Sequence, residues 1–263
     1  MKAPNLSLYF ICCFLLFSCG TTNSKKSGNS NRSENVANVK QGSPEKVNLD
    51  LGVGYLKRGR DGDLEIALEK FKKSLAYNPE YALAHSMIAN VYDQKGLFND
   101  AKKHYDLSIK YNNSNPDIVN NYANFLCQRG SYDSAINYYM KVAKNPQYSS
   151  PAYAYENAGI CSYKSKNKTQ AEDFFRKAVD INPKQSNSLF YLMTISIENK
   201  KHMKARAFLQ RLEGLFNPSA ELLLAGYNIE KALGNSDLAK NYLSTLKEKY
   251  PRSESLKRIN EEK

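Results

Sequence analysis

The sequence has few of the residues and motifs that catalysis and metal binding require. Its three histidines, His85, His104 and His202, lie far apart along the chain, and none stands at metal-ligand spacing from a cysteine or an acidic residue. A glycine-rich phosphate loop, a nucleophile elbow and an H-E-x-x-H helix are all missing from the sequence. We therefore expect a protein that is not an enzyme and that holds no cofactor and no metal.

The N-terminal apolar stretch, residues 6–17, is too short for a transmembrane helix, which needs roughly 20 apolar residues. It follows a single positive charge at Lys2, which is typical of a signal peptide. The first 18 residues are therefore expected to be removed.

A lipid-attachment motif follows directly. Residues 16–19 read Leu-Phe-Ser-Cys and resemble a bacterial lipobox, although Phe17 is bulkier than the pattern prefers. We expect acylation of Cys19, where several acyl chains give stable anchoring. Because Gly20 and not aspartate follows, the expected location is the periplasmic face of the outer membrane. An ordinary secreted protein cleaved nearby is the alternative.

Acidic residues are too few to balance the basic ones: 38 Lys and Arg stand against 26 Asp and Glu, a net charge of +12. Loss of Lys2 with the signal peptide lowers this to +11. In a periplasmic protein we expect no nucleic acid as partner, but anionic lipid head groups, acidic polymers or an acidic protein face. The alternative is that the solvated helix faces are simply basic.

Large apolar residues are almost absent between residues 19 and 44, where Thr, Asn, Ser, Lys and Gly dominate. Such a segment buries too little surface to offset its ordering entropy, so we expect a tether. A coil of about 25 residues has a root-mean-square reach of roughly 25–30 Å. The folded body is then expected just off the membrane surface.

The rest of the chain is repetitive. Small residues recur at intervals of 34, 34, 36, 34 and 34 residues, a period typical of tetratricopeptide repeats, at Ala67, Ala101, Ala135, Ala171, Ala205 and Ala239. Four residues after each alanine stands an aromatic residue or leucine on the same helix face, from Phe71 to Leu243. The fold predicted is an all-α superhelical solenoid of about six helical hairpins over residues 45–251, followed by a polar tail, 252–263.

Turn residues support the hairpins. Gly59, Gly96, Gly130 and Gly234 fall between the two helices of a repeat, where positive φ is tolerated. Lys166 and Lys200 stand in the equivalent turns of the fourth and fifth repeats, which therefore depart from the pattern. The first repeat has an insertion around residues 60–63, which predicts a longer turn.

The first helix of each repeat is expected to line a concave binding surface. Projection of the helical period places an apolar group there in the first repeat, Leu49, Val53 and Leu56, suited to an apolar peptide. In the next repeats the lining is polar and aromatic and includes Asn90, Gln94, Asn120, Asn124, Gln128, Tyr153, Glu156 and Tyr163. Asparagine amides there can bind a peptide backbone. Alternatively, the three apolar residues pack against the tether or an N-terminal turn.

Besides the acylated Cys19, two cysteines remain in the mature chain, Cys127 and Cys161, in neighbouring first helices and in an oxidising compartment. A disulfide between the third and fourth repeats is geometrically plausible. Two buried free thiols are the alternative.

A family resemblance rests on several segments in order: residues 120–127 (NNYANFLC), 130–133 (GSYD), 145–148 (NPQY) and 156–161 (ENAGIC), with 51–56 (LGVGYL) before them. Together with the lipobox, tether and six repeats, these resemble the PilF/PilW family of type IV pilus biogenesis and stability lipoproteins. Departures are Ala123, where the family often has glycine, and the insertion near Gly62.

The resemblance implies a pilotin, an outer-membrane lipoprotein that binds secretin subunits and aids their targeting, assembly or stability, and thereby twitching motility. The expected partners are type IV pilus secretin subunits and outer-membrane lipid through acylated Cys19, and the protein alone is expected to be monomeric. The alternative is a repeat scaffold for another envelope complex: β-barrel assembly, cell-wall enzymes or a type II secretion secretin.

Overall fold

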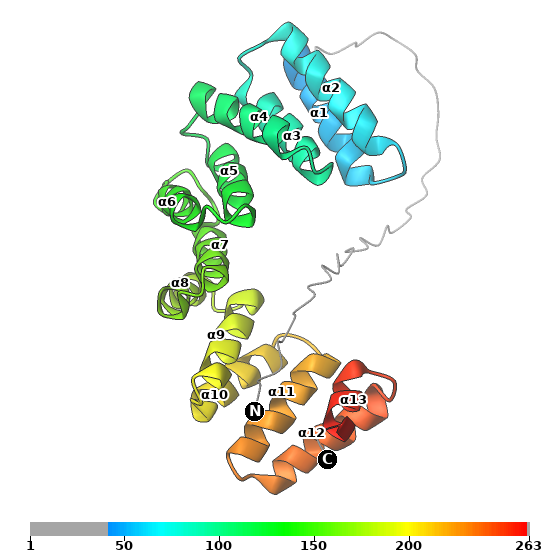
Figure 1. The fold of residues 1–263 in the computed structure, drawn as a ribbon, viewed down its shortest axis with the longest axis vertical. Helices are drawn as coiled ribbons and strands as arrows, with labels where there is room; N and C mark the ends of the chain where they lie inside the picture. Colours follow the sequence, from blue (N-terminus) through cyan, green and yellow to red (C-terminus); the bar gives the residue numbers. More distant parts are fainter. Residues whose placement is uncertain (1–41, 262–263) are drawn as a thin grey trace, which may run out of the picture. The chain divides into compact units, whose positions relative to one another are not determined.

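Six helical hairpins follow one another within residues 42–261, the part of the chain that the computed structural model describes (Figure 1). The predicted signal peptide, Cys19 and most of the predicted tether lie outside these residues. The hairpins are α1 (Pro44–Arg58) with α2 (Asp63–Tyr77), α3 (Ala82–Gln94) with α4 (Phe98–Tyr111), α5 (Pro116–Gln128) with α6 (Tyr132–Ala143), α7 (Pro151–Lys164) with α8 (Lys168–Ile181), α9 (Ser186–Glu198) with α10 (His202–Glu213), and α11 (Ala220–Ala232) with α12 (Ser236–Lys249). The predicted all-α repeat fold is confirmed.

The recurring alanines stand at the contact between the two helices of each repeat. From α2 to α10 their exposed fraction is 0%, and that of Ala239 in α12 is 5%. The aromatic residues one turn later, Phe71, Tyr105, Tyr139 and Phe175, are also buried. Small residues on the first helix make room for these rings. A Cβ at Gly52 would lie 2.4 Å from a ring carbon of Phe71, and one at Gly159 would lie 2.7 Å from a ring carbon of Phe175.

The turns inside the second to sixth repeats share one backbone geometry. In each, the residue in the left-handed region is followed by an amide that donates to the carbonyl five residues earlier, as in Lys201 N to Ser196 O at 2.8 Å. Glycine holds the left-handed position in three of these turns, with φ from 75° to 80°. Lys166 and Lys200 hold it in the other two, with φ of 66° and 56°. The repeat geometry therefore imposes positive φ even where the residue is lysine.

The first repeat has the longer turn that the insertion predicts. Gly59 and Gly62 both have positive φ, and α2 begins at Asp63. The buried Asp63 carboxylate accepts from the Arg58 guanidinium and from the Arg60 amide at 3.0 Å. The hydrogen bond from Arg58 lowers the pKa of Asp63 to about 2. A charged network thus fixes this turn at neutral pH.

The end of the described chain is a helix and not simply a polar tail. Helix α13 (Glu254–Glu261) packs on α11, with Ile259 and Ser255 each only 2% exposed. It covers an apolar cluster that includes Leu223 of α11 and Leu246 of α12. This is the capping that the last repeat of a solenoid requires. Across residues 42–261, every helix falls short of the length and apolar character needed to cross a bilayer.

Candidate functional site: the first helices of the repeats

Five of the predicted lining residues lie on the first helices of three successive repeats: Asn90 on α3, Asn120, Asn124 and Gln128 on α5, and Tyr153 on α7. We call these five the first-helix row. Gln128 is exposed, and the Tyr153 ring is 53% exposed and so free to meet a ligand. The three asparagines are half-buried. The row therefore offers amide groups and one exposed ring rather than a closed pocket.

The asparagine amides are oriented by neighbouring side chains. Asn124 accepts a hydrogen bond from the Tyr139 hydroxyl at 2.6 Å, and Asn90 accepts one from Gln94 at 2.6 Å. The Asn157 amide donates to Asn120 at 3.2 Å. Because each bond engages the side-chain oxygen of the asparagine, its NH₂ group keeps donor capacity for a peptide carbonyl.

Glu156, also predicted to line the surface, is buried instead, with 3% exposed. Its carboxylate accepts from the Ser188 amide at 3.1 Å, the Ser188 hydroxyl at 2.9 Å and the Asn187 amide group at 3.2 Å. These are groups in the first turn of α9, where a negative charge is favourable. Glu156 therefore fastens the fourth repeat to the fifth and is not available to a ligand.

The apolar residues predicted to line the first repeat face its core. Leu49 is 7% exposed, and Val53 and Leu56 are half-buried against the same cluster, which includes Phe71 and Ile88. Among the described residues, their packing partners lie on α2 and α3.

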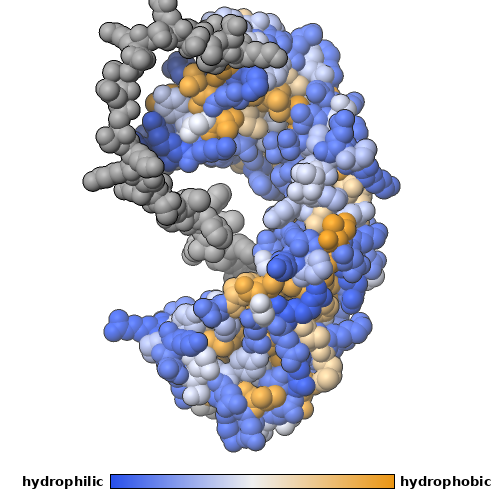
Figure 2. All heavy atoms as spheres, turned by 180° about the vertical axis from the view of Figure 1, so that it is seen from behind, coloured by the Kyte–Doolittle hydropathy of each residue, from blue (hydrophilic) through white to orange (hydrophobic). Residues whose placement is uncertain are grey.

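A different apolar face of α1 stays open. Val47 is 42% exposed and Leu51 is 49% exposed, and together with Tyr55 and Gly54 they line a shallow cavity of about 500 Å³ flanked by Asp50 and Arg58. Figure 2 shows apolar side chains grouped among polar ones on the first repeats, at the top of the view. Sequence reasoning missed this face. The signal that marks it is Gly52, whose contact with Phe71 fixes the buried side of α1.

Cys127 and Cys161 are joined by a disulfide, with 5.7 Å between their Cα atoms. The bond links α5 to α7, the first helices of the third and fourth repeats. Both residues are buried, 5% and 0% exposed, and the bond fixes the spacing of α5 and α7, which carry four of the five residues of the first-helix row.

Two of the histidines meet in the second repeat, although they are far apart in sequence. His85 of α3 and His104 of α4 place their Nδ1 atoms 2.9 Å apart. His85 Nε2 lies 3.0 Å from the Pro79 carbonyl, which only accepts, so His85 donates there and its Nδ1 accepts from His104. Burial, and secondarily His85, lowers the pKa of His104 to about 4. Among residues 42–261 no group of three or more His, Cys, Asp or Glu gathers as metal ligands do.

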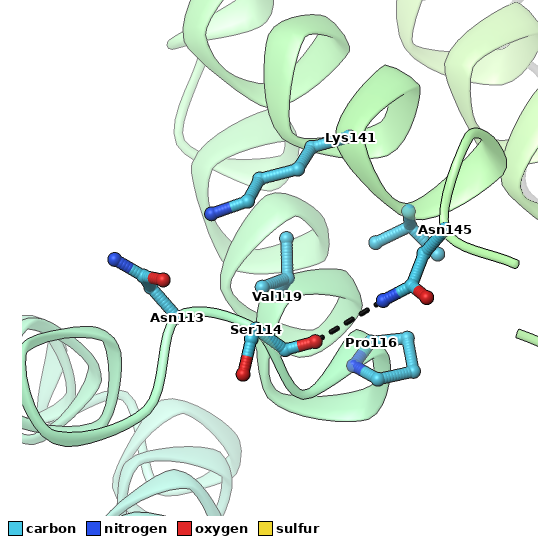
Figure 3. A pocket seen from close by; sticks show the side chains of 7 residues that line it. Asn113, Ser114, Pro116, Val119, Lys141 and Asn145 are labelled. Carbon is cyan, nitrogen blue, oxygen red and sulfur yellow. Dashed lines mark hydrogen bonds between the residues drawn. The ribbon is translucent and has the colours of Figure 1, made fainter. Parts of the chain in front are cut away.

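A second cavity, of about 220 Å³, lies between the second and third repeats (Figure 3). Pro116, Val119 and Val142 give it an apolar lining, and Asn113 and Lys141 stand at its edge. The Asn145 amide donates to the Ser114 carbonyl at 3.1 Å and so ties the end of α6 to the preceding connection. The cavity contains no acid–base pair and none of the predicted site residues.

Comparisons with known proteins agree with this geometry. Tetratricopeptide-repeat family models match residues 82–115, 126–186 and 222–253. The type IV pilus assembly protein PilF of Pseudomonas aeruginosa is 26% identical over 205 residues, which are 78% of this chain and 80% of that protein. The solved structure of Pseudomonas aeruginosa PilF superposes with a TM-score of 0.72 at 25% identity and covers 84% of this chain and 98% of its own. That of PilW, described as a widely conserved type IV pilus biogenesis factor, gives 0.71 at 24% identity, covering 82% and 97%.

The fold and the family models define a tetratricopeptide-repeat protein, a class that presents helical surfaces to other molecules. Within that class the chain is homologous to PilF, with the same repeat architecture as PilF and PilW. The expected resemblance to the PilF/PilW family is confirmed.

Proposed function

We propose that the chain is an outer-membrane lipoprotein of type IV pilus biogenesis that binds secretin subunits and aids their targeting, assembly or stability. The observation that carries this proposal is the similarity to PilF over 78% of the chain, together with the superposition on the PilF structure over 84% of the chain. A repeat scaffold without a catalytic cluster acts by binding, so the activity is a matter of surface and location.

Acylated Cys19 supplies the location in this proposal, and residues 20–43 supply the reach. The open face of α1 receives an apolar segment of the partner, because Val47, Leu51 and Tyr55 repeat at intervals of four residues along one side of the helix. Asp50, paired with Lys46 at 2.7 Å, and Arg58, paired with Asp63, make the edges of this face polar and so limit the apolar contact to its centre. The first-helix row then binds an adjoining stretch of backbone through its amides.

The test is complementation of a strain that lacks the protein, with surface pili and growth as the readouts. Leu51→Asp places a charge on the open face of α1, and Leu238→Asp is its matched control, because Leu238 is 48% exposed in the first turn of α12. We expect the control to restore pili, and the Leu51 variant to fail while its thermal unfolding stays close to that of the unsubstituted protein. Full piliation with Leu51→Asp would contradict binding at α1.

The same strain separates the alternative scaffold functions. Loss of pili with ordinary growth supports the pilus assignment. Detergent sensitivity or cell-wall defects in the deletion strain, with pili intact, would instead point to β-barrel assembly or cell-wall enzymes.

A further inference from the structure

One basic residue at the turn of each of the first three repeats is paired with an acidic side chain, whereas five at the turns of the next two repeats are not paired within the described part of the chain. Arg58 pairs with Asp63, Lys95 pairs with Glu65 at 3.0 Å, and Arg129 pairs with Asp93 at 2.7 Å. By contrast, the turns of the fourth and fifth repeats carry five exposed lysines, for which no ion pair occurs within residues 42–261: Lys164, Lys166, Lys200, Lys201 and Lys204. We call these five the basic platform.

The two turns of the platform are adjacent in space. Glu198 at the end of α9 accepts from the Tyr163 hydroxyl at 2.7 Å and pairs with Lys168 at 3.0 Å, which joins the end of α7 and the start of α8 to the fifth turn. Because the two helices of a hairpin run antiparallel and neighbouring hairpins stack, the turns inside neighbouring repeats lie on the same side of the stack, away from the connections between repeats. The five lysines therefore form a single positive surface on that edge.

Two further features distinguish this surface. Lys166 and Lys200 adopt positive φ, where glycine avoids the steric penalty that lysine incurs, and strained positions of this kind gather at functional sites. Met203, between Lys201 and Lys204, is 63% exposed. Exposed basic residues around an apolar side chain are the composition of a surface that contacts lipid head groups.

We propose that the basic platform rests on the anionic head groups of a phospholipid bilayer. Neither of the two cavities described above includes these lysines, and lysine acts as a point charge rather than a bidentate clamp. The contact depends on the proposed function only in that the lipid anchor brings a bilayer within reach. Two-point attachment then fixes which edge of the solenoid faces the membrane and leaves the first-helix row free for a protein partner.

The test uses residues 42–263, which contain every packed cluster described above and neither the anchor nor the tether lysines. Vesicles of phosphatidylcholine alone, and vesicles in which part of it is replaced by phosphatidylglycerol, are sedimented with the protein. We expect binding only to the anionic vesicles, weakened by added salt. Since each lysine near an anionic surface contributes about fivefold, Lys166→Asn with Lys200→Asn should lower the partition coefficient about 30-fold.

The matched control removes the same charge from the opposite edge through Lys144→Asn and Lys184→Asn, both exposed, and should change the partition coefficient little. Asparagine tolerates positive φ, so the platform variant is expected to be at least as stable as the unsubstituted unit, which a melting curve checks. Equal binding to neutral vesicles, no binding to either, or an equal loss in the control would overturn the proposal. Because the assay contains no anchor and no secretin, failure to bind vesicles leaves the proposed function standing. Likewise, failure of the secretin role leaves the vesicle-binding result unchanged.

Discussion

At the scale of single residues, Lys166 and Lys200 carry strain that the fold does not need. Their side chains are exposed, and their turns have the same hydrogen-bond pattern as the glycine turns. An L-residue in the left-handed region costs roughly 1–2 kcal/mol. Glycine avoids this steric cost, but its larger loss of chain entropy on folding offsets part of the gain.

Lys166→Gly and Lys200→Gly should therefore each raise the free energy of unfolding by about 0.5–1 kcal/mol. Chemical denaturation of the single variants measures this. Gly130→Ala is the reciprocal variant: φ there is 80°, and an added Cβ meets no atom within 4 Å, so a loss of about 1 kcal/mol would be purely conformational. If neither glycine variant has a higher free energy of unfolding than the unsubstituted protein, the two lysines are not strained.

The His85–His104 contact makes stability depend on pH. Burial lowers the pKa of both rings, to about 4 for His104, below the unfolded value near 6.5. A histidine whose pKa is lower in the folded state favours folding when neutral. Its contribution is therefore complete above pH ~6.5 and is lost as the pH falls toward ~4. His85, Lys72 and Lys103 around His104 reinforce the shift, and only Asp100 opposes it.

We expect His104→Gln to flatten the fall in unfolding free energy between pH 6.5 and 4, relative to the unsubstituted protein. Denaturation series at several pH values measure the difference in unfolding free energy between the variant and the unsubstituted protein. The carboxylates that titrate in the same pH range contribute equally to both proteins and cancel in this difference. A fall in the His104→Gln variant that runs parallel to that of the unsubstituted protein would show that the pair contributes nothing.

At the scale of helices, close approach within a hairpin depends on small residues facing rings. The separation from Gly159 to Phe175 is 16 residues, whereas that from Gly52 to Phe71 is 19. The three-residue difference is the insertion in the first turn. The helical projection that predicts the lining residues of α1 takes no account of Gly52, which marks the buried side of that helix. The projection therefore places Leu49 on the binding surface and overlooks Leu51.

Between repeats, the Cys127–Cys161 disulfide acts as a staple. It closes a loop of 34 residues, worth about 3–4 kcal/mol in the chain-entropy account. We expect Cys127→Ala with Cys161→Ala to lower the free energy of unfolding by that amount without changing the helix content. Thiol titration of the denatured, unreduced protein should find neither cysteine free. Two free thiols, or an unchanged stability in the double variant, would contradict the staple.

At the scale of the whole molecule, the repeat fold was predictable because six alanines at intervals of 34 to 36 residues define the buried face of every second helix. The contacts that cross between helices were less predictable. Glu156 reaches Ser188 across 32 residues, and His85 meets His104 across 19, and neither spacing belongs to a known motif. The basic platform is visible only when ion pairs in neighbouring repeats show which cations are neutralised.

We propose that this repeat protein acts on a secretin at the outer membrane through its anchor. The decisive measurement is the amount of heat-resistant secretin multimer in outer-membrane fractions from cells with the protein, without it, and with Cys19→Ala. We expect multimers to be lost or misplaced without the protein and not to be restored by Cys19→Ala. Normal multimers in the outer membrane of cells that lack the protein would contradict it.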